Sequence, residues 1–357
     1  MPIENEKDAK ASISGSSVSA RIIAAGIVIA FCYWASTVLV TLVIAVLMAY
    51  FLDPVVNWLE DWHIPRALGA LIVVLSTICL MMVLVWTLIL RVDQFGRDWP
   101  NYQEPLRKAA SAVSKKLETF ETHVSEIEPQ DKAAGQRIVA VAESHPVRNA
   151  LISRLGALEA FFVAATFVPF LLFFMLAAKR QVWHATMQLF PATERTRVKQ
   201  TLAEVTLVLR SYVIGTALVG LILVFASWMF FLSIGLEFPF LAALVSGMVN
   251  LIPYFGVVLS WLPPVIIGLK QFKHVETYVG IVVMMTFLHL VAANLLMPAL
   301  VGWRVRLNAL ALTVALLFWG WLWGPMGLIL AVPITAVIKV LCDHVESLQP
   351  VGRWLSA

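Results

Sequence analysis

An uncharged run of 32 residues, from Phe238 to Leu269, constrains this chain more than any other stretch. A straight helix of that length would reach about 48 Å, whereas the hydrocarbon core of a bilayer is about 30 Å thick. Two full spans would need about 40 apolar residues before any turn. The run is too long for one upright span and too short for two, so we expect two half-depth helices that meet at a break.

The sequence within Gly247–Gly256 predicts where that break lies. Pro253 removes a backbone donor, and Asn250, three residues earlier, supplies an amide that can cap a helix or bind a ligand. Tyr254 offers a hydroxyl or an aromatic packing surface, and Gly256 permits a turn or close packing. Irregular backbone at membrane depth persists only where protein or a water-filled cavity satisfies it. The break is therefore a predicted substrate or ion site.

Composition extends this prediction to the whole chain. Of its 357 residues, 60% are hydrophobic and 13% charged, and the mean hydropathy is +0.85. Several uncharged runs exceed 18 residues, and no ten-residue alternation typical of an outer-membrane barrel is present. These features predict an all-α polytopic membrane protein with about eight membrane segments and no nucleic-acid partner. Cys32, Cys79 and Cys342 lack metal-site spacing, so we predict packing roles for them, with no metal and no cofactor.

A second uncharged run of 32 residues, 307–338, is interrupted at Gly320–Gly327, which includes Gly324 and Pro325. The second half of the chain thus alternates span, broken run, span, broken run. If both broken runs (238–269 and 307–338) are re-entrant, they enter from opposite sides, as in the inverted repeats of secondary transporters. The alternative is that each run is one kinked span, and the flanking charges do not distinguish the two.

Charge placement predicts the topology. Residues 22–52 are expected to form two spans with a turn at Ser36-Thr37, and Ala67–Leu90 a third that ends at Arg91. The loop 179–210 has the strongest basic bias and is placed in the cytoplasm. Both termini then lie in the cytoplasm.

Between the third and fourth spans, charged residues are interleaved with apolar ones at helical spacing, with a turn expected at Glu126–Asp131. This stretch is predicted to be a small extracytoplasmic helical domain. The predicted divisions are a cytoplasmic tail (1–20), three membrane helices (21–91), the helical domain (92–159), a fourth membrane helix (160–178), a basic amphipathic segment (179–210), a transport core (211–341) with a fifth span at 211–236 and a later span at 277–302, and a cytoplasmic tail (342–357).

No enzyme motif or buried acidic pair is found, so we predict neither catalysis nor catalytic residues. Polar groups within the spans are therefore the candidates for a transport site. His289 is either a proton relay or a neutral imidazole bonded between helices. Asn294 lies about 140° around a regular helix from His289, so the two share a site only if Pro298 kinks the span. Trp321 and its neighbours crowd the second predicted hairpin tip, where they are candidates to line a pathway.

Four blocks resemble one family of bacterial permeases. They are Leu209-Arg210-Ser211-Tyr212, Asn250-Leu251-Ile252-Pro253-Tyr254-Phe255-Gly256, Pro298 through Gly302, and Gly327-Leu328-Ile329-Leu330-Ala331-Val332-Pro333. In order, spacing and layout the chain resembles the autoinducer-2 exporter (AI-2E) family, formerly grouped as uncharacterised permeases. The resemblance implies a multi-pass transporter of the bacterial inner membrane that forms homo-oligomers and that either exports a small sugar-like signal or exchanges sodium for protons.

Ala292 departs from this resemblance, because family members commonly carry an acid two positions before the later Asn. A second departure is Asn308-Ala309, where a proline is usual. Without the carboxylate the chain lacks the obvious cation ligand or proton carrier, which weakens the exchange hypothesis.

Three functions follow as hypotheses. The first is export of a small polar organic solute such as autoinducer-2, through a site formed at the helix breaks. The second is Na⁺/H⁺ antiport through His289. The third is a non-transporting scaffold in the membrane lipid, whose exterior helical domain binds a partner.

Overall fold

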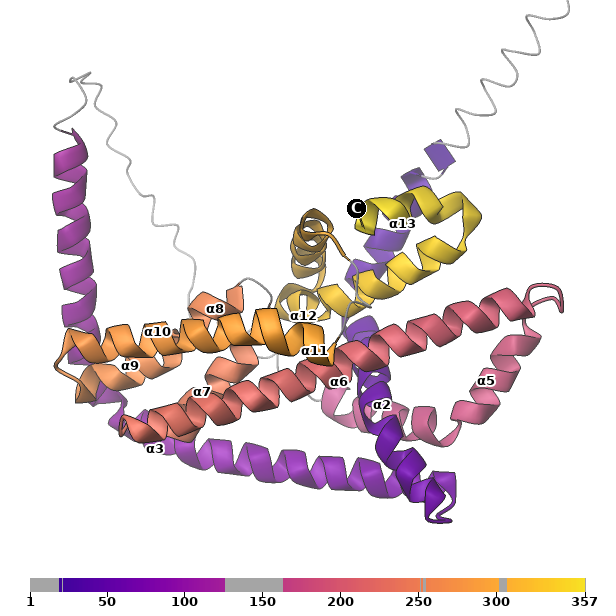
Figure 1. The fold of residues 1–357 in the computed structure, drawn as a ribbon, viewed down its shortest axis with the longest axis horizontal. Coiled ribbons are helices and arrows are strands. Elements are labelled where there is room, and N and C mark those ends of the chain that lie inside the picture. Colours follow the sequence, from indigo (N-terminus) through magenta and orange to yellow (C-terminus); the bar gives the residue numbers. More distant parts are fainter. Residues whose placement is uncertain are drawn as a thin grey trace, which may run out of the picture. The chain divides into compact units, whose positions relative to one another are not determined.

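The computed structural model describes residues 19–356 except 21, 126–162, 251, 253–254 and 302–306. Every regular element among these residues is a helix, which confirms the predicted all-α class (Figure 1). The chain divides into two compact units, which are described separately. The first comprises Met1–Leu71, Ala160–Leu209 and Arg306–Ala357, and the second comprises Ile72–Glu159 and Arg210–Val305.

Five described helical segments are long and apolar enough to cross a membrane, and a sixth is added if a bent pair forms one span. The five are Ser36–Asp61 (α2), Arg66–Pro100 within α3, Arg195–Ser233 (α6), Val275–Leu300, and Ala309–His344 (α12). The bent pair is Val163–Ala177 with Lys179–Gln188 (α5), at 73°. The prediction of several membrane helices is confirmed, while the count of about eight is not.

The first unit begins with a short apolar helix, Ile22–Trp34, followed by α2. The turn predicted at Ser36-Thr37 lies one residue earlier, at Ala35. α2 continues through Pro54 to Asp61, as the amphipathic pattern after Asp53 predicts. A short connection that includes His63 then leads into α3.

α3 runs from Arg66 to Ser125 as one helix of 60 residues. The uncharged stretch stops at Arg91, but the helix does not end there. A charged residue limits how far an apolar segment extends into lipid, yet it does not break backbone hydrogen bonding. The expected turn at Glu126–Asp131 and the rest of the helical domain up to 159 lie outside the described residues.

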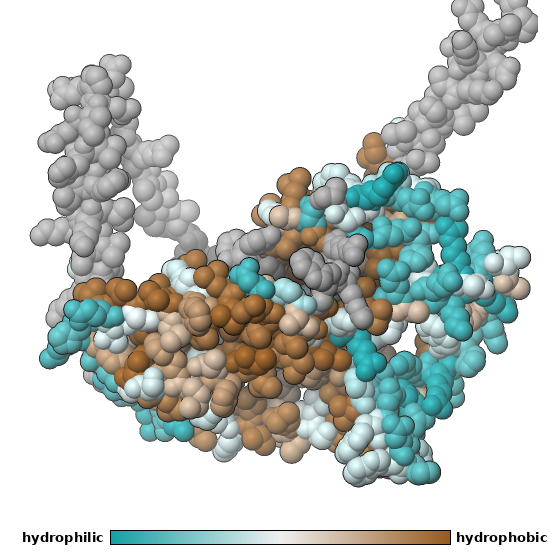
Figure 2. All heavy atoms as spheres, in the orientation of Figure 1, coloured by the Kyte–Doolittle hydropathy of each residue, from teal (hydrophilic) through white to brown (hydrophobic). Residues whose placement is uncertain are grey.

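The helix that contains most of the fifth predicted span also extends into charged sequence. α6 covers Arg195–Ser233, so it starts well before Ser211 and ends before Leu236. The basic segment 179–210 is therefore mainly helical, because it contains α5 and the first turns of α6. Hydrophilic residues gather over α5 and those first turns (Figure 2).

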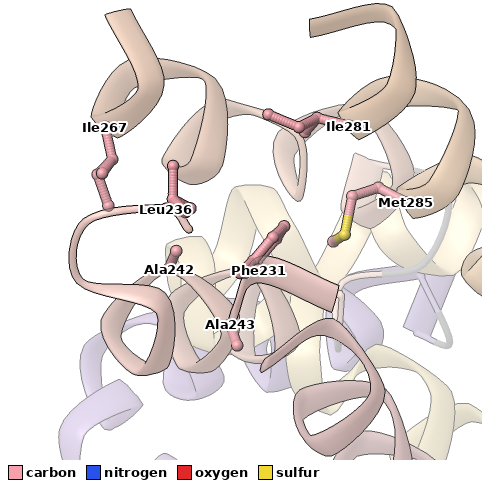
Figure 3. Close-up of a cluster of buried hydrophobic side chains, with 7 residues drawn as sticks. All are labelled: Phe231, Leu236, Ala242, Ala243, Ile267, Ile281 and Met285. Carbon is pink, nitrogen blue, oxygen red and sulfur yellow. The ribbon is translucent and has the colours of Figure 1, made fainter. Parts of the chain in front are cut away.

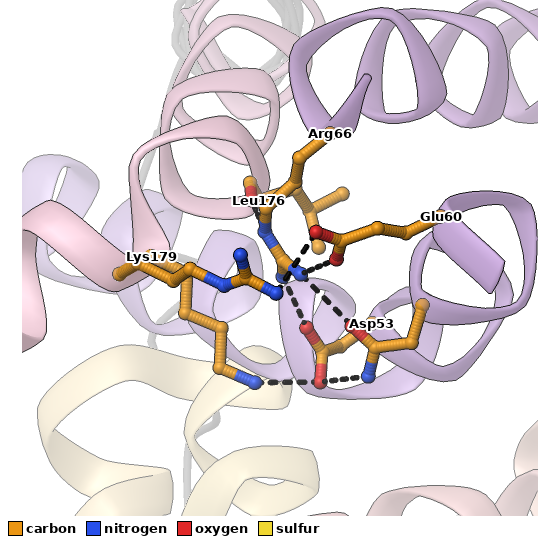
Figure 4. Close-up of polar contacts among 7 residues, drawn as sticks. Asp53, Glu60, Arg66, Leu176 and Lys179 are labelled. Atoms are coloured by element: carbon orange, nitrogen blue, oxygen red, sulfur yellow. Dashed lines mark hydrogen bonds and ion pairs between the residues drawn. The ribbon is translucent and has the colours of Figure 1, made fainter. Parts of the chain in front are cut away.

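A half-buried ion cluster joins four helices of the first unit (Figure 4). Arg66, at the start of α3, pairs with Asp53 and Glu60 of α2, each at 2.9 Å. Its Nε donates to the carbonyl oxygen of Leu176 at 2.9 Å. Lys179, at the start of α5, pairs with Asp53 at 2.7 Å. The side chain of Asp53 is 8% exposed, so two cations compensate a nearly buried carboxylate.

The second broken run also lies in the first unit, as α12. Its length would suffice for a span, but Gly324 is non-helical, with φ 62° and ψ −142°. The indole Nε1 of Trp319 lies 3.3 Å from Thr335 Oγ1, although the two residues would be about 24 Å apart along a straight helix. A Cβ on Gly327 would overlap the carbonyl oxygen of Trp319. α12 is therefore two arms folded back at Gly324, close to the predicted position.

A final helix, α13 (Gln349–Ser356), contacts the start of α12, where Asn308 N–H donates to the Leu355 carbonyl at 2.9 Å.

The first broken run lies in the second unit, as α7 (Pro239–Val249), α8 (Phe255–Leu259) and α9 (Leu262–Gln271). Its two ends meet. Glu237 N–H donates to Gln271 Oε1 at 2.9 Å, and Lys270 Nζ lies 3.4 Å from Glu237 Oε2. Midway, Ser246 Oγ donates to the Ser260 carbonyl at 2.8 Å. The run is therefore a helical hairpin, and neither arm is long enough to span the core of a bilayer.

α10 (Val275–Val291) packs beside this hairpin and continues through a π-helical turn, Ala292–Leu296, into α11 (Met297–Leu300). A cluster of buried side chains joins α6, α7, α9 and α10 (Figure 3). Its members are Phe231, Leu236, Ala242, Ala243, Ile267, Ile281 and Met285. The outward faces of α10 and the second half of α6 are strongly apolar (Figure 2), as lipid contact requires.

Candidate functional site

The tip of the first hairpin brings together two of the predicted site residues. α7 ends at Val249, and Asn250 follows as its C-cap. His289, in the last turn of α10, places its Nδ1 2.7 Å from Asn250 Oδ1. This hydrogen bond links the hairpin break to the neighbouring helix across 39 positions of sequence.

The chemistry of this pair sets which nitrogen of the imidazole carries a hydrogen. A carboxamide oxygen only accepts hydrogen bonds, so His289 donates from Nδ1–H, and in the neutral ring Nε2 is left as an acceptor. The pair therefore presents a carboxamide and an imidazole with a defined tautomer. Such a set recognises hydroxyl groups, which both donate and accept.

A small cavity of about 10 Å³ adjoins the pair. It has room for about one water molecule. Its polar lining consists of Asn250, His289 and three serines, Ser227, Ser246 and Ser260. The remaining lining residues are Leu223, Gly247, Met285 and Leu288. None of these nine residues is Asp, Glu, Lys or Arg, so the cavity is polar but carries no fixed charge.

Close helix packing keeps this cavity small. A Cβ on Gly247 would overlap the side chain of Val224, so α7 approaches α6 at glycine. Ser227 Oγ lies 3.7 Å from Met285 Sδ, and Ser260 Oγ donates to the Val257 carbonyl at 2.7 Å. The hydroxyl groups of the lining thus have partners within the second unit, and a larger occupant requires the hairpin to move.

Ala292, the position where the resemblance leads one to expect an acid, is 3% exposed. It packs with Val219 and Leu223 of α6, with Leu296 and Met297 beside them. An apolar environment of this kind does not stabilise a cation.

Asn294 does not join the pair. Its Nδ2 donates to the Leu290 carbonyl at 2.9 Å, and its side chain is exposed. The helix here is a π-turn, in which Met297 N–H bonds to the Ala292 carbonyl. Pro298 has no N–H to offer the Asn294 carbonyl, which accounts for the interruption. Pro298 thus alters the helix as the sequence analysis considered, but Asn294 and His289 still do not share a site.

The remaining predicted site residues of the first break are only partly described. Pro253 and Tyr254 lie outside the described residues. Gly256, in α8, is buried, and a Cβ there would lie 2.7 Å from the Cα of Asn250. Glycine at 256 therefore permits the close return of the chain past Asn250.

Trp321, Gly324 and Pro325 belong to the hairpin of the first unit. The Trp321 ring is 67% exposed and stacks on Tyr33, with ring centroids 6.4 Å apart. Gly324 makes the fold-back, and Pro325 begins the second arm. Trp323 Nε1 donates to the Cys32 carbonyl at 3.0 Å. The tip is thus packed against the N-terminal apolar helix of its own unit.

Sequence reasoning missed the serines of the cavity and the ion cluster around Asp53. Serine is common in membrane helices, and only the fold shows that Ser227, Ser246 and Ser260 face one space. A signal for the cluster existed in the sequence, since Asp53 directly follows a long uncharged run and lies inside α2, where a carboxylate needs a partner.

Comparison with known proteins adds to this geometry. A family model described as "AI-2E family transporter" matches residues 22–347. The putative transport protein YrrI of Bacillus subtilis (strain 168) is 29% identical over 315 residues, which cover 86% of each chain.

Two relatives of Escherichia coli (strain K12) are similar over most of their length. The AI-2 transport protein TqsA is 25% identical over 329 residues, 90% of each chain. The putative transport protein YhhT is 24% identical over 328 residues, 92% of this chain and 90% of the relative. The family match covers both units and the polar cavity.

Proposed function

Because the chain belongs to the AI-2E family of transporters, and is thus a multi-pass membrane transporter, we propose that it exports a small neutral polar solute across the bacterial inner membrane. The observation that carries this proposal is the 2.7 Å bond between Asn250 and His289 at the hairpin tip. A relative named for AI-2 transport supports a hydroxylated, sugar-like solute such as autoinducer-2 as the first candidate.

The hydrogen bond between Asn250 and His289 holds the site closed, and the solute replaces this bond. A hydroxyl group of the solute accepts from His289 Nδ1–H and donates to Asn250 Oδ1, so both partners stay satisfied when their mutual bond opens. The cavity holds about one water, so solute entry requires the hairpin to separate from α10. Exposure of the pair to one side and then the other completes the cycle, with the hairpin re-entrant in the bilayer.

Sodium/proton exchange gains no specific support. The cavity lining contains no acidic residue, and Ala292 is packed among apolar side chains. Cation coupling and homo-oligomers remain predictions from the resemblance. Cytoplasmic termini and an extracytoplasmic helical domain remain predictions from the placement of charges.

The test is efflux from liposomes that contain the purified protein and a panel of hydroxylated solutes, including autoinducer-2. We expect efflux of at least one solute without a sodium or proton gradient. Asn250→Ala and His289→Ala are expected to lower the initial rate at least about tenfold, since each removes a hydrogen bond to the solute. Thr286→Val, also on α10, removes only a bond to the Val282 carbonyl and serves as the matched control.

Two results would contradict the proposal. One is efflux by both cavity variants at the wild-type rate. The other is solute movement by the wild type that occurs only with a sodium gradient.

A further inference from the structure

A second, larger cavity of about 520 Å³ lies in the second unit, where the hairpin begins. Such a volume is typical of small-molecule sites. Arg91 and Thr87 come from α3, one turn apart and on the same face. Glu237 comes from the turn before α7. The other lining residues are apolar or aromatic, namely Trp228, Phe238, Pro239, Phe240 and Leu241.

The position of Arg91 places this cavity at a membrane boundary. The uncharged stretch Ala67–Leu90 is 24 residues long and reaches about 36 Å, enough to cross the hydrocarbon core. Arg91 is the first charge after it. Its guanidinium therefore lies at headgroup level, as Arg at span ends commonly does.

The guanidinium of Arg91 has N–H donors available for a ligand. Arg91 is exposed, and its Nη1 donates to Gln94 Oε1 at 3.3 Å. It has no acidic partner among the described residues. Guanidinium groups carry five donors in a planar fork that matches phosphate oxygens. The cavity thus offers a phosphate-binding group beside apolar walls.

The opposite charge is also present. Glu237 Oε2 lies 3.4 Å from Lys270 Nζ, and its side chain is 40% exposed. A carboxylate on the wall disfavours a purely anionic ligand, but it suits one that carries an ammonium next to its phosphate. The walls include the ring pair of Trp228 and Phe240, with centroids 5.8 Å apart, which suits an acyl chain.

We propose that this cavity binds a phosphatidylethanolamine molecule of the surrounding membrane. Its phosphate pairs with Arg91, its primary ammonium pairs with Glu237, and its glycerol and upper acyl chain lie on Trp228, Phe240 and Leu241. The lipid then contacts the first residues of α7, the arm that ends at Asn250. This site is separate from the Asn250–His289 pair and does not depend on the proposed function.

The test is lipid binding to the purified full-length protein, followed by native mass spectrometry. The probes are phosphatidylethanolamine, phosphatidylglycerol and phosphatidylcholine with identical acyl chains. We expect phosphatidylethanolamine to bind at least about tenfold more tightly than the other two. Phosphatidylglycerol has no ammonium, and the trimethylammonium of phosphatidylcholine has no N–H to donate to Glu237.

Substitutions at Arg91 and Glu237 test the contributions of the two charges separately. Arg91→Gln is expected to weaken phosphatidylethanolamine and phosphatidylglycerol alike, whereas Arg91→Lys retains part of the binding. Glu237→Gln is expected to abolish the preference between them. Lys270→Gln breaks the same ion pair from the other side but leaves the carboxylate, so the preference should persist.

Arg97→Gln is the control for Arg91, because Arg97 is on the same helix and pairs with Asp93 outside the cavity. Melting temperatures are compared for all variants, so that a folding defect is recognised. Unchanged phosphatidylethanolamine binding in Arg91→Gln would overturn the proposal. So would an unchanged preference in Glu237→Gln, or displacement of the lipid by an equal concentration of free phosphoethanolamine, which would indicate a site for soluble solutes.

Discussion

At the scale of single residues, the bond between Asn250 and His289 has the most direct bearing on function. It joins neutral groups inside a helical bundle, where such bonds contribute about 0.6 kcal/mol on average and up to about 1.7 kcal/mol. The pair therefore stabilises the closed hairpin only modestly. A contact of this strength can be exchanged for a solute hydroxyl without unfolding the site.

The coupling between these two side chains is measurable. In a double-mutant cycle of Asn250→Ala and His289→Ala, we expect a coupling free energy of unfolding of about 1 kcal/mol, since each single change already removes the shared bond. Equilibrium unfolding in mild detergent with increasing denaturant supplies the values. Strictly additive effects of the two changes would show that the bond is absent in solution.

Gly324 is the residue on which the second hairpin depends. Its φ of 62° and ψ of −142° lie in a region that is open to glycine and costly for residues with a Cβ. Gly324→Ala is expected to lower the free energy of unfolding by about 1–3 kcal/mol. Gly280→Ala is the control, because a Cβ at 280 meets no atom within 4 Å. Equal melting temperatures for the two variants would contradict the fold-back.

At the scale of helices, the ion cluster around Asp53 holds α2, α3 and the start of α5 together. Asp53→Asn removes the nearly buried carboxylate that Arg66 and Lys179 share. We expect a loss of about 3–5 kcal/mol in the free energy of unfolding. Asp93→Asn, which breaks the exposed pair with Arg97, is expected to cost less than about 1 kcal/mol. Comparable losses for the two variants would mean that the cluster is solvated.

The first hairpin makes a prediction about membrane sidedness. Its ends are bonded through Glu237 and Gln271, so the flanking residues Ser233 and Lys273 should face the same side of the membrane. Single cysteines at 233 and 273, in a background with Cys32, Cys79 and Cys342 replaced by alanine, are expected to react with an impermeant thiol reagent from one side only, and from the same side. Labelling from opposite sides would mean that the run is one kinked span.

Length and the placement of proline and glycine were enough to predict a break in each run, since an uncharged run of 32 residues fits neither one span nor two. They did not distinguish a hairpin from one kinked span. The breaks fall where Asn250 and Gly324 were singled out. The bounds of α3 and α6 could not be predicted in this way. Hydropathy indicates where the lipid-facing stretch ends, whereas a helix continues through charged residues that suit its backbone, as α3 does at Arg91 and α6 at Arg210.

The polar cavity was predictable only in part. Asn250 and His289 were identified as rare polar groups within apolar segments, but their pairing depends on how the hairpin packs on α10. Ser227, Ser246 and Ser260 carried no distinguishing signal, because serine is common in membrane helices and its role depends on what it faces. The Asn250–His289 bond and the serine lining both depend on tertiary packing, which sequence periodicity does not encode.

At the scale of the whole molecule, a family match over residues 22–347 and several membrane-capable helices describe a multi-pass transporter. Its candidate site is neutral, which favours an uncharged solute over a bare cation. The lipid proposed for the Arg91 cavity would act on the same hairpin from its other end.

Equilibrium binding of the transported solute to the purified protein shows whether Asn250 and His289 hold it. We expect Asn250→Ala and His289→Ala each to weaken binding at least about tenfold, while Thr286→Val binds as the wild type does. Wild-type affinity in both cavity variants, with the protein still folded, would place the solute elsewhere.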